Sequence, residues 1–179
     1  MASRGHVKPR KGAKVHFGGI VMMVVAISAT KVIACHHVVG NWNAHQAVDM
    51  HANTLVPALR KTYPAKKRFL LLEDNDPAGY KSNLAKAAKA AAKIDVLPFP
   101  KRSPDLNPLD YAFWDCVNRK LRAQERRFPA RKKESHTAFV ARLRRTIKSV
   151  PSSVLTPMVM SMKRRCVALK AAKGQGFEE

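Results

Sequence analysis

The sequence predicts one α/β domain built around a mixed β-sheet, and three observations lead to that fold class. The chain has 179 residues, which suffices for one domain with a sizeable core. Two apolar stretches separated by a short turn come first and predict a pair of neighbouring strands. After them, strand patterns alternate with helical patterns, which is typical of α/β domains.

The amino-terminal half contributes the strands of the predicted sheet. A basic leader over residues 1–14 precedes strands at residues 15–27 and 31–39, both rich in β-branched residues. Apolar residues then recur at helical spacing over residues 43–60 and predict a helix with one buried face. The run RFLLL predicts a third strand that ends abruptly at EDNDPAG.

Helices dominate the prediction for the remainder of the chain. The Ala-rich residues 82–93 predict a helix, and IDVLPFP predicts a fourth strand closed by prolines. Beyond these, helical patterns cover residues 108–124, 137–149 and 153–172, with a charged linker, ERRFPARKKE, after the first of them. We therefore expect a helical, basic C-terminal extension to the α/β core.

The charge balance points to a polyanionic partner. The chain has 34 Lys and Arg residues against 12 Asp and Glu, a formal net charge of +22. That excess separates it from an ordinary soluble enzyme with a mixed surface, and nucleic acid is the expected partner rather than a membrane. Three widely spaced cysteines without a C-x-x-C pair predict reduced thiols inside a cell.

One stretch supports a different interpretation. Residues 17–30, FGGIVMMVVAISAT, are uncharged, follow a basic leader and end in small residues, as a signal peptide would. A secreted basic protein cleaved near Ala29 is therefore an alternative. Fourteen residues are too few to span a bilayer as a helix, and their β-branched content favours a buried strand.

Two acids occupy positions typical of a metal site. Asp74 follows the RFLLL strand, and the carboxyl ends of strands are where open α/β sheets place their sites. Asp110 follows Asn107 and Pro108, a favoured start of a helix. Turn chemistry alone explains Asp74, and a favourable helix dipole alone explains Asp110. A Mg²⁺ ion held between the two acids is the alternative explanation for both.

Three blocks resemble the catalytic domain of the Tc/mariner superfamily of DDE/D transposases. They are LLLEDNDP, SPDLNPLDYAFW and SMKRRCVALKAAKG, spread over the C-terminal three quarters of the chain. The resemblance implies an RNase H-like fold with a catalytic core over residues 15–135 and basic helices over residues 136–179. It identifies Asp74 and Asp110 as the second and third catalytic acids and metal ligands, 36 positions apart.

The resemblance also implies the chemistry and the partners. Enzymes of this family cleave DNA and transfer strands with two Mg²⁺ or Mn²⁺ ions, which a cluster of carboxylates must hold. The implied partners are transposon ends and target DNA, a homodimer is compatible with them, and the implied location is the nucleus, or the nucleoid of a prokaryote.

The sequence departs from the family pattern at two points. The family carries its first catalytic acid on the first strand, but here the first acid is Asp49, inside a predicted helix. Gly79, or a neighbour, stands where a histidine is common. We therefore expect an amino-terminally truncated and inactive transposase whose first strand is missing.

The competing function is a non-catalytic nucleic-acid-binding protein derived from a transposable element. Basic residues without interleaved aromatic residues predict phosphate contacts with little sequence preference. The candidate DNA-binding residues are Arg119, Lys120, Arg126, Arg127, Arg131, Lys132, Lys133, Lys163, Arg164 and Arg165.

Overall fold

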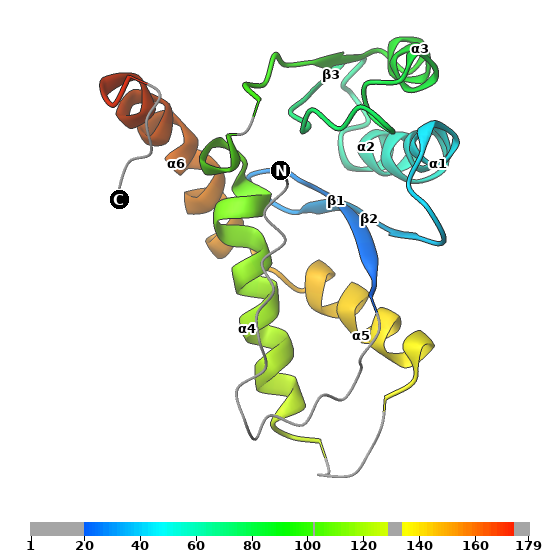
Figure 1. Cartoon of the computed structure of the whole chain (residues 1–179), viewed down its shortest axis with the longest axis vertical. Helices are drawn as coiled ribbons and strands as arrows, with labels where there is room; N and C mark the ends of the chain where they lie inside the picture. Colours follow the sequence, from blue (N-terminus) through cyan, green and yellow to red (C-terminus); the bar gives the residue numbers. More distant parts are fainter. Residues whose placement is uncertain (1–19, 102, 129–133, 174–179) are drawn as a thin grey trace.

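The computed structural model describes residues 20–101, 103–128 and 134–173. Figure 1 shows a central hairpin, with a group of helices and a second strand pair on one side and the long C-terminal helices on the other. The predicted leader and the first residues of the first predicted strand lie outside the described residues, as do Arg131, Lys132 and Lys133.

The hairpin consists of strands β1 (Met22–Ile27) and β2 (Val32–Val38), which pair antiparallel with Val25 opposite Cys35. The Ser28 side chain accepts a hydrogen bond from the Lys31 backbone N–H at 3.3 Å and helps close the connecting turn. Both predicted strands are therefore confirmed where the chain is described. Within the stretch of the signal-peptide alternative, residues 22–27 form a paired strand.

Both faces of the hairpin are covered, because successive side chains of a strand point to opposite faces. Val25 and Cys35 are buried in one cluster with Phe113, Ile147 and other residues of the C-terminal helices. Val24 and Ala34 pack in a second cluster, which contains Met50, Leu55 and Ile94. The hairpin is thus the layer that joins the two halves of the molecule.

A nearly continuous helix follows the hairpin, as predicted. It comprises α1 (Ala44–Asp49), a π-helical segment (Met50–Leu55) and α2 (Val56–Thr62). The Asn43 side chain caps its start by accepting from the backbone N–H groups of His45 and Gln46. Pro57 lacks an N–H group and its ring crowds the carbonyl four residues earlier, which accounts for the wide π turn.

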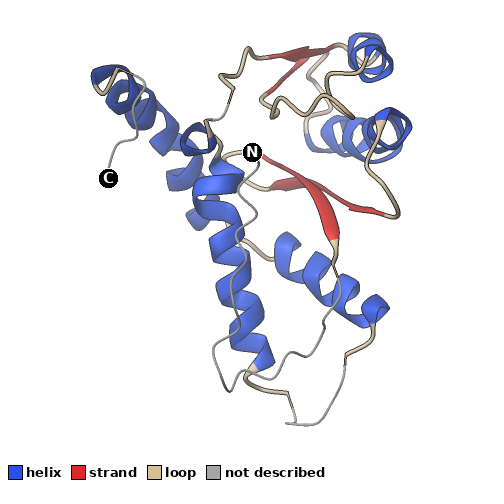
Figure 2. Cartoon of the chain, in the orientation of Figure 1, coloured by secondary structure: helices blue, strands red, loops and turns tan. Residues whose placement is uncertain are grey.

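Strands β3 (Phe69–Leu71) and β4 (Ile94–Val96) form a second, parallel pair, with α3 (Asn83–Ala91) between them in sequence. Ser82 caps α3 by accepting from the Ala85 N–H. The expected mixture of parallel and antiparallel pairing is present, but in the described residues it is divided between two two-stranded sheets (Figure 2).

The C-terminal helices begin with a short 3₁₀ turn (Pro104–Leu106) and a π-helical segment (Leu109–Phe113) that leads into α4 (Trp114–Glu125). Helices α5 (His136–Lys148) and α6 (Ser152–Ala171) follow, close to their predicted bounds. Ile147 of α5 and Leu155 of α6 are fully buried in the cluster that also holds Phe113. In the described part of the chain, no helix is long and apolar enough to cross a membrane.

Candidate active site

A cavity of about 380 Å³ lies between the two sheets, and both predicted catalytic acids line it. Its walls include residues 23–27 of β1 and residues 70–74 at the end of β3. Consecutive residues of a strand line a cavity when the strand presents an edge to it, since a face would contribute alternate residues. In the described residues β1 pairs only with β2 and β3 only with β4, so each has an unpaired edge.

Asp74 is placed by the end of β3, where the chain turns away toward α3. Its carboxylate is exposed and accepts a 3.3 Å hydrogen bond from the Asp76 backbone N–H. Neighbouring protein atoms still displace part of its hydration, which raises the pKa of Asp74, and the charge of Asp76 adds to the increase. The predicted position at the carboxyl end of a strand is confirmed.

Asp110 lies on the opposite wall, at the start of the helix that leads into α4. The Asn107 side chain accepts from the Leu109 N–H at 3.2 Å, as a helix cap does, and donates to Asp110 Oδ2 at 2.8 Å. Desolvation raises the pKa of Asp110, and the charge of Asp74 raises it further. The two acids therefore interact electrostatically across one cavity.

The donor set fits a hard divalent cation but supplies only part of a two-metal site. Exposed carboxylate oxygens on a cavity wall suit Mg²⁺ or Mn²⁺, which favour oxygen ligands. Among the described residues, no group of three His, Cys, Asp or Glu side chains is placed to hold a metal ion. Asp49 accepts from Asn53 on its own helix and does not line the cavity, so it adds no third ligand.

The turn after Asp74 is held by an unexpected contact with Trp42. Asp76 Oδ2 accepts hydrogen bonds from the Trp42 Nε1–H at 2.8 Å and from the Gly79 backbone N–H at 2.7 Å. A Cβ atom on Gly79 would clash with the indole ring of Trp42. The close approach of Trp42 thus leaves room only for glycine at position 79.

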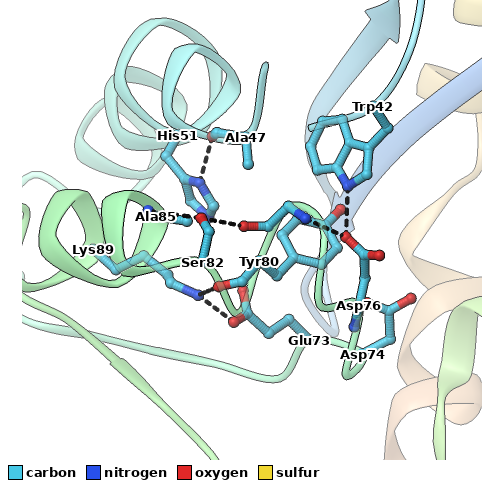
Figure 3. A network of polar contacts seen from close by, with 11 residues as sticks. Trp42, Ala47, His51, Glu73, Asp74, Asp76, Tyr80, Ser82, Ala85 and Lys89 are labelled. Carbon is cyan, nitrogen blue, oxygen red and sulfur yellow. Dashed lines mark hydrogen bonds and ion pairs between the residues drawn. The ribbon is translucent and has the colours of Figure 1, made fainter. Parts of the chain in front are cut away.

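Sequence reasoning missed a buried polar group directly behind Asp74. Glu73 and Lys89 form a buried ion pair, and Lys89 Nζ also donates to the Tyr80 carbonyl at 3.0 Å (Figure 3). Burial is the largest influence on the pKa of Glu73 and raises it, although Lys89 opposes that increase. Little in the sequence indicates that Lys89 is buried, because a lysine in an Ala-rich helix ordinarily lies on a solvated face.

Most of the predicted DNA-binding residues that the structure describes are on the surface. Arg119, Arg126, Arg127, Lys163 and Arg164 are exposed, and Lys120 is half-buried. Arg119 also pairs with Asp115 one helical turn earlier at 3.1 Å. Their role in binding DNA stays a prediction.

Arg165 is engaged by the protein itself. Its guanidinium lies over the Tyr111 ring, 3.8 Å from the centroid, and donates to the Asp105 carbonyl at 3.2 Å. Tyr111 in turn donates to the Met158 carbonyl at 2.6 Å. Arg165 therefore fastens α6 to the segment that carries Asp110.

Comparison with known proteins places this chain in a family. The model of the DDE superfamily endonucleases matches residues 3–135. The chain belongs to the DDE superfamily endonuclease family. The Tcb1 transposase of Caenorhabditis briggsae is 30% identical over 159 residues, and the Tc1 transposase of Caenorhabditis elegans is 27% identical over 160 residues. Each alignment covers 89% of this chain and 54% of the relative, so the chain spans about half the length of these curated relatives.

Solved structures confirm the RNase H-like fold class of this DDE-family chain. It resembles the catalytic domain of Mos1 mariner transposase with a TM-score of 0.72 and 20% identity, over 88% of this chain and 76% of that one. It also resembles the Mos1 paired-end complex with Mn, with a TM-score of 0.78 and 21% identity, over 99% and 51% of the two chains. The resemblance to the catalytic domain of Tc1/mariner transposases, inferred from three sequence blocks, is confirmed.

Proposed function

We propose that this chain is part of the DNA-cleaving centre of a cut-and-paste transposase, in which Asp74 and Asp110 hold a divalent cation. The observation that carries the proposal is the position of the two acids, which line one cavity, where the charge of Asp74 raises the pKa of Asp110. Mos1 structures with Mg and with Mn support the choice of cation. Two ions, rather than one, are the expected number in a complete site.

The chemistry follows from the donors. Divalent ions in such a site polarise the phosphodiester and favour ionisation of the attacking water or hydroxyl group. Asp74 contributes a carboxylate from a strand end and Asp110 contributes one from a helix start. Asn107 restrains the Asp110 carboxylate, which reduces the conformational freedom lost when a cation is bound.

A third carboxylate is needed for catalysis, and the cavity offers a position for the strand that would bring it. Among the residues that the structure describes, the edges of β1 and β3 beside the cavity are unpaired. A strand carrying an Asp, supplied ahead of residue 1, would pair with these edges and end beside Asp74 and Asp110. On this proposal the 179 residues bind DNA without cleaving it.

The proposed partner is DNA. The net charge of +22 and the exposed basic residues of α4 and α6 favour contacts with phosphates. Mos1 has been solved as a paired-end complex and as a strand transfer complex. We extend this to transposon ends and target DNA for the present chain, with a homodimer as the assembly and the nucleus, or a prokaryotic nucleoid, as the location.

A second candidate function is supported by the incomplete carboxylate set. A non-catalytic DNA-binding protein derived from a transposable element needs the basic surface but neither acid. Loss of Asp74 and Asp110 would then leave cation binding unchanged and strengthen DNA binding, because two negative charges would be removed.

Mn²⁺ binding distinguishes the two functions. Electron paramagnetic resonance of free Mn²⁺ measures the affinity of the chain and of Asp74→Asn, Asp110→Asn and Asp49→Asn. We expect one site that is weakened at least about tenfold by either of the first two changes and unaffected by the third. Absence of that site, or its survival in Asp74→Asn, overturns the catalytic proposal.

A further inference from the structure

The loop that carries Asp74 begins and ends at one buried side chain. After β3 ends at Leu71, the chain passes through Glu73, Asp74 and the Asp76 turn, and reaches Tyr80 just before α3. Lys89, from the last turn of α3, binds the Glu73 carboxylate at the beginning of the loop and the Tyr80 carbonyl at its end. Figure 3 shows both contacts converging on the Lys89 ammonium group.

Lys89 is distinguished from Lys86, the other lysine of helix α3, by burial. Its side chain is 3% exposed and that of Glu73 is 5% exposed, whereas Lys86, on the same helix, is exposed. Burying an ion pair is costly because both charges lose their hydration. An apolar pair would fill the same space without that cost, so stability alone gives a poor reason for this arrangement.

The ion pair has a second effect, which is to join the two ends of the loop that carries Asp74. The Lys89 ammonium group has three donors, and a carboxylate and a carbonyl from opposite ends of the loop accept from it. Trp42 holds the middle of the same loop through Asp76. The backbone on both sides of Asp74 is therefore fixed, while the Asp74 carboxylate itself stays exposed on the cavity wall.

We propose that Lys89 is a positioning residue: by joining Glu73 to the Tyr80 carbonyl, it holds the loop in the conformation that directs Asp74 toward the cation. This inference rests on the proposed function, because it assumes that Asp74 is a metal ligand. The proposal gives Glu73 and Lys89 a role that is indicated neither by the sequence motifs around Asp74 and Asp110 nor by the distribution of charge along the chain.

A charge-neutral double variant separates positioning from stability. Lys89→Met alone leaves Glu73 buried without its cation, so it is strongly destabilised. Glu73→Leu combined with Lys89→Met removes one negative and one positive charge, replaces the pair with apolar groups and leaves the net charge unchanged. It cannot, however, restore a donor to the Tyr80 carbonyl. Lys86→Met is the matched control, since it makes the same substitution at an exposed position of the same helix.

Two measurements on these proteins test the proposal. The first is Mn²⁺ affinity by electron paramagnetic resonance, and the second is amide hydrogen exchange over residues 74–82 without metal. We expect the double variant to unfold close to the temperature of the unaltered chain, yet to bind Mn²⁺ about tenfold more weakly and to exchange loop amides faster. Lys86→Met should match the unaltered chain in both measurements.

The outcomes are distinct. A stable double variant that binds Mn²⁺ within about twofold of the unaltered chain, or that retains loop protection, overturns the positioning role and leaves the proposed function intact. An unaltered chain whose Mn²⁺ affinity does not depend on Asp74 overturns the proposed function, and the positioning role with it.

Discussion

The indole ring of Trp42 fills the space that a Cβ atom on Gly79 would require. Trp42 comes from the segment between β2 and α1, whereas Gly79 comes from the loop after β3. Their contact, secured by the shared partner Asp76, holds the loop that carries Asp74 against the first helix. Glycine at position 79 thus has a steric reason within this chain.

The first prediction concerns that contact. Gly79→Ala forces the indole or the loop to move, and we expect it to lower the free energy of unfolding by about 1–3 kcal/mol. Trp42→Phe removes the atoms that clash, at the cost of the hydrogen bond to Asp76. In urea denaturation the double variant should therefore be more stable than the sum of the two single changes predicts. Additive losses would show that Trp42 does not restrict position 79.

A second prediction compares Lys163 with Arg165, both on α6. Arg165 stacks on Tyr111 and binds the Asp105 carbonyl, so Arg165→Ala should destabilise the protein by roughly 0.5–2 kcal/mol. Lys163 is exposed, and Lys163→Ala should mainly weaken DNA binding. Thermal unfolding and DNA titrations of both variants test the contrast. If the two variants lost the same amount of stability and of DNA affinity, the two side chains would not have different roles.

A third prediction concerns how the protein binds DNA. If exposed Lys and Arg side chains contact phosphates, the logarithm of the binding constant should fall linearly with the logarithm of salt concentration. Each lost phosphate contact, as in Lys163→Ala, should reduce the slope by about 0.9, whatever the DNA sequence. Fluorescence anisotropy with two unrelated duplexes measures the slopes. Salt-independent binding is incompatible with this mode of recognition.

The fourth prediction is a pH dependence of stability that arises at His51. Burial lowers the pKa of His51 below its ordinary value of 6.5, and Nδ1 lies 2.6 Å from the Ala47 carbonyl oxygen. The unfolded chain takes up a proton at about pH 6.5, where the folded chain resists it. The stabilisation of the folded chain by neutral His51 is therefore complete above pH 6.5. It is lost as the pH falls toward the lower pKa that His51 has in the folded chain.

Urea denaturation between pH 7.5 and 5 measures this dependence. His51→Leu should flatten it, while His37→Leu, at a more exposed histidine whose pKa burial also lowers, should change it little. An unchanged slope in His51→Leu would assign the pH dependence to other groups.

The sequence predicted most of the secondary structure, because periodicity and capping residues act locally. Asn43, Ser82 and Asn107 each cap the helix expected after them. The placement of Asp74 and Asp110 also followed from local motifs, since a strand end and a helix start fix where each acid lies.

Contacts between residues that are distant in the sequence could not be predicted from local sequence patterns. Nothing local indicates that Lys89 is buried while Lys86 is exposed, or that Trp42 fills the space beside Gly79. The division of the predicted mixed sheet into two pairs depends on how separate segments pack. Arg165 likewise resembles its basic neighbours in sequence, and only its packing on Tyr111 distinguishes it.

The central claim is that Asp74 and Asp110 are two of the acids of a DNA-cleaving centre that an upstream strand completes. The most direct test is cleavage of transposon-end DNA with Mg²⁺ or Mn²⁺ by the 179-residue chain and by a form extended with a strand carrying an Asp. We predict cleavage only by the extended form, and its loss in Asp74→Asn or Asp110→Asn, because an amide removes the charge that the cations require. Metal-dependent cleavage by the 179 residues themselves, abolished by Asp49→Asn, would contradict the account.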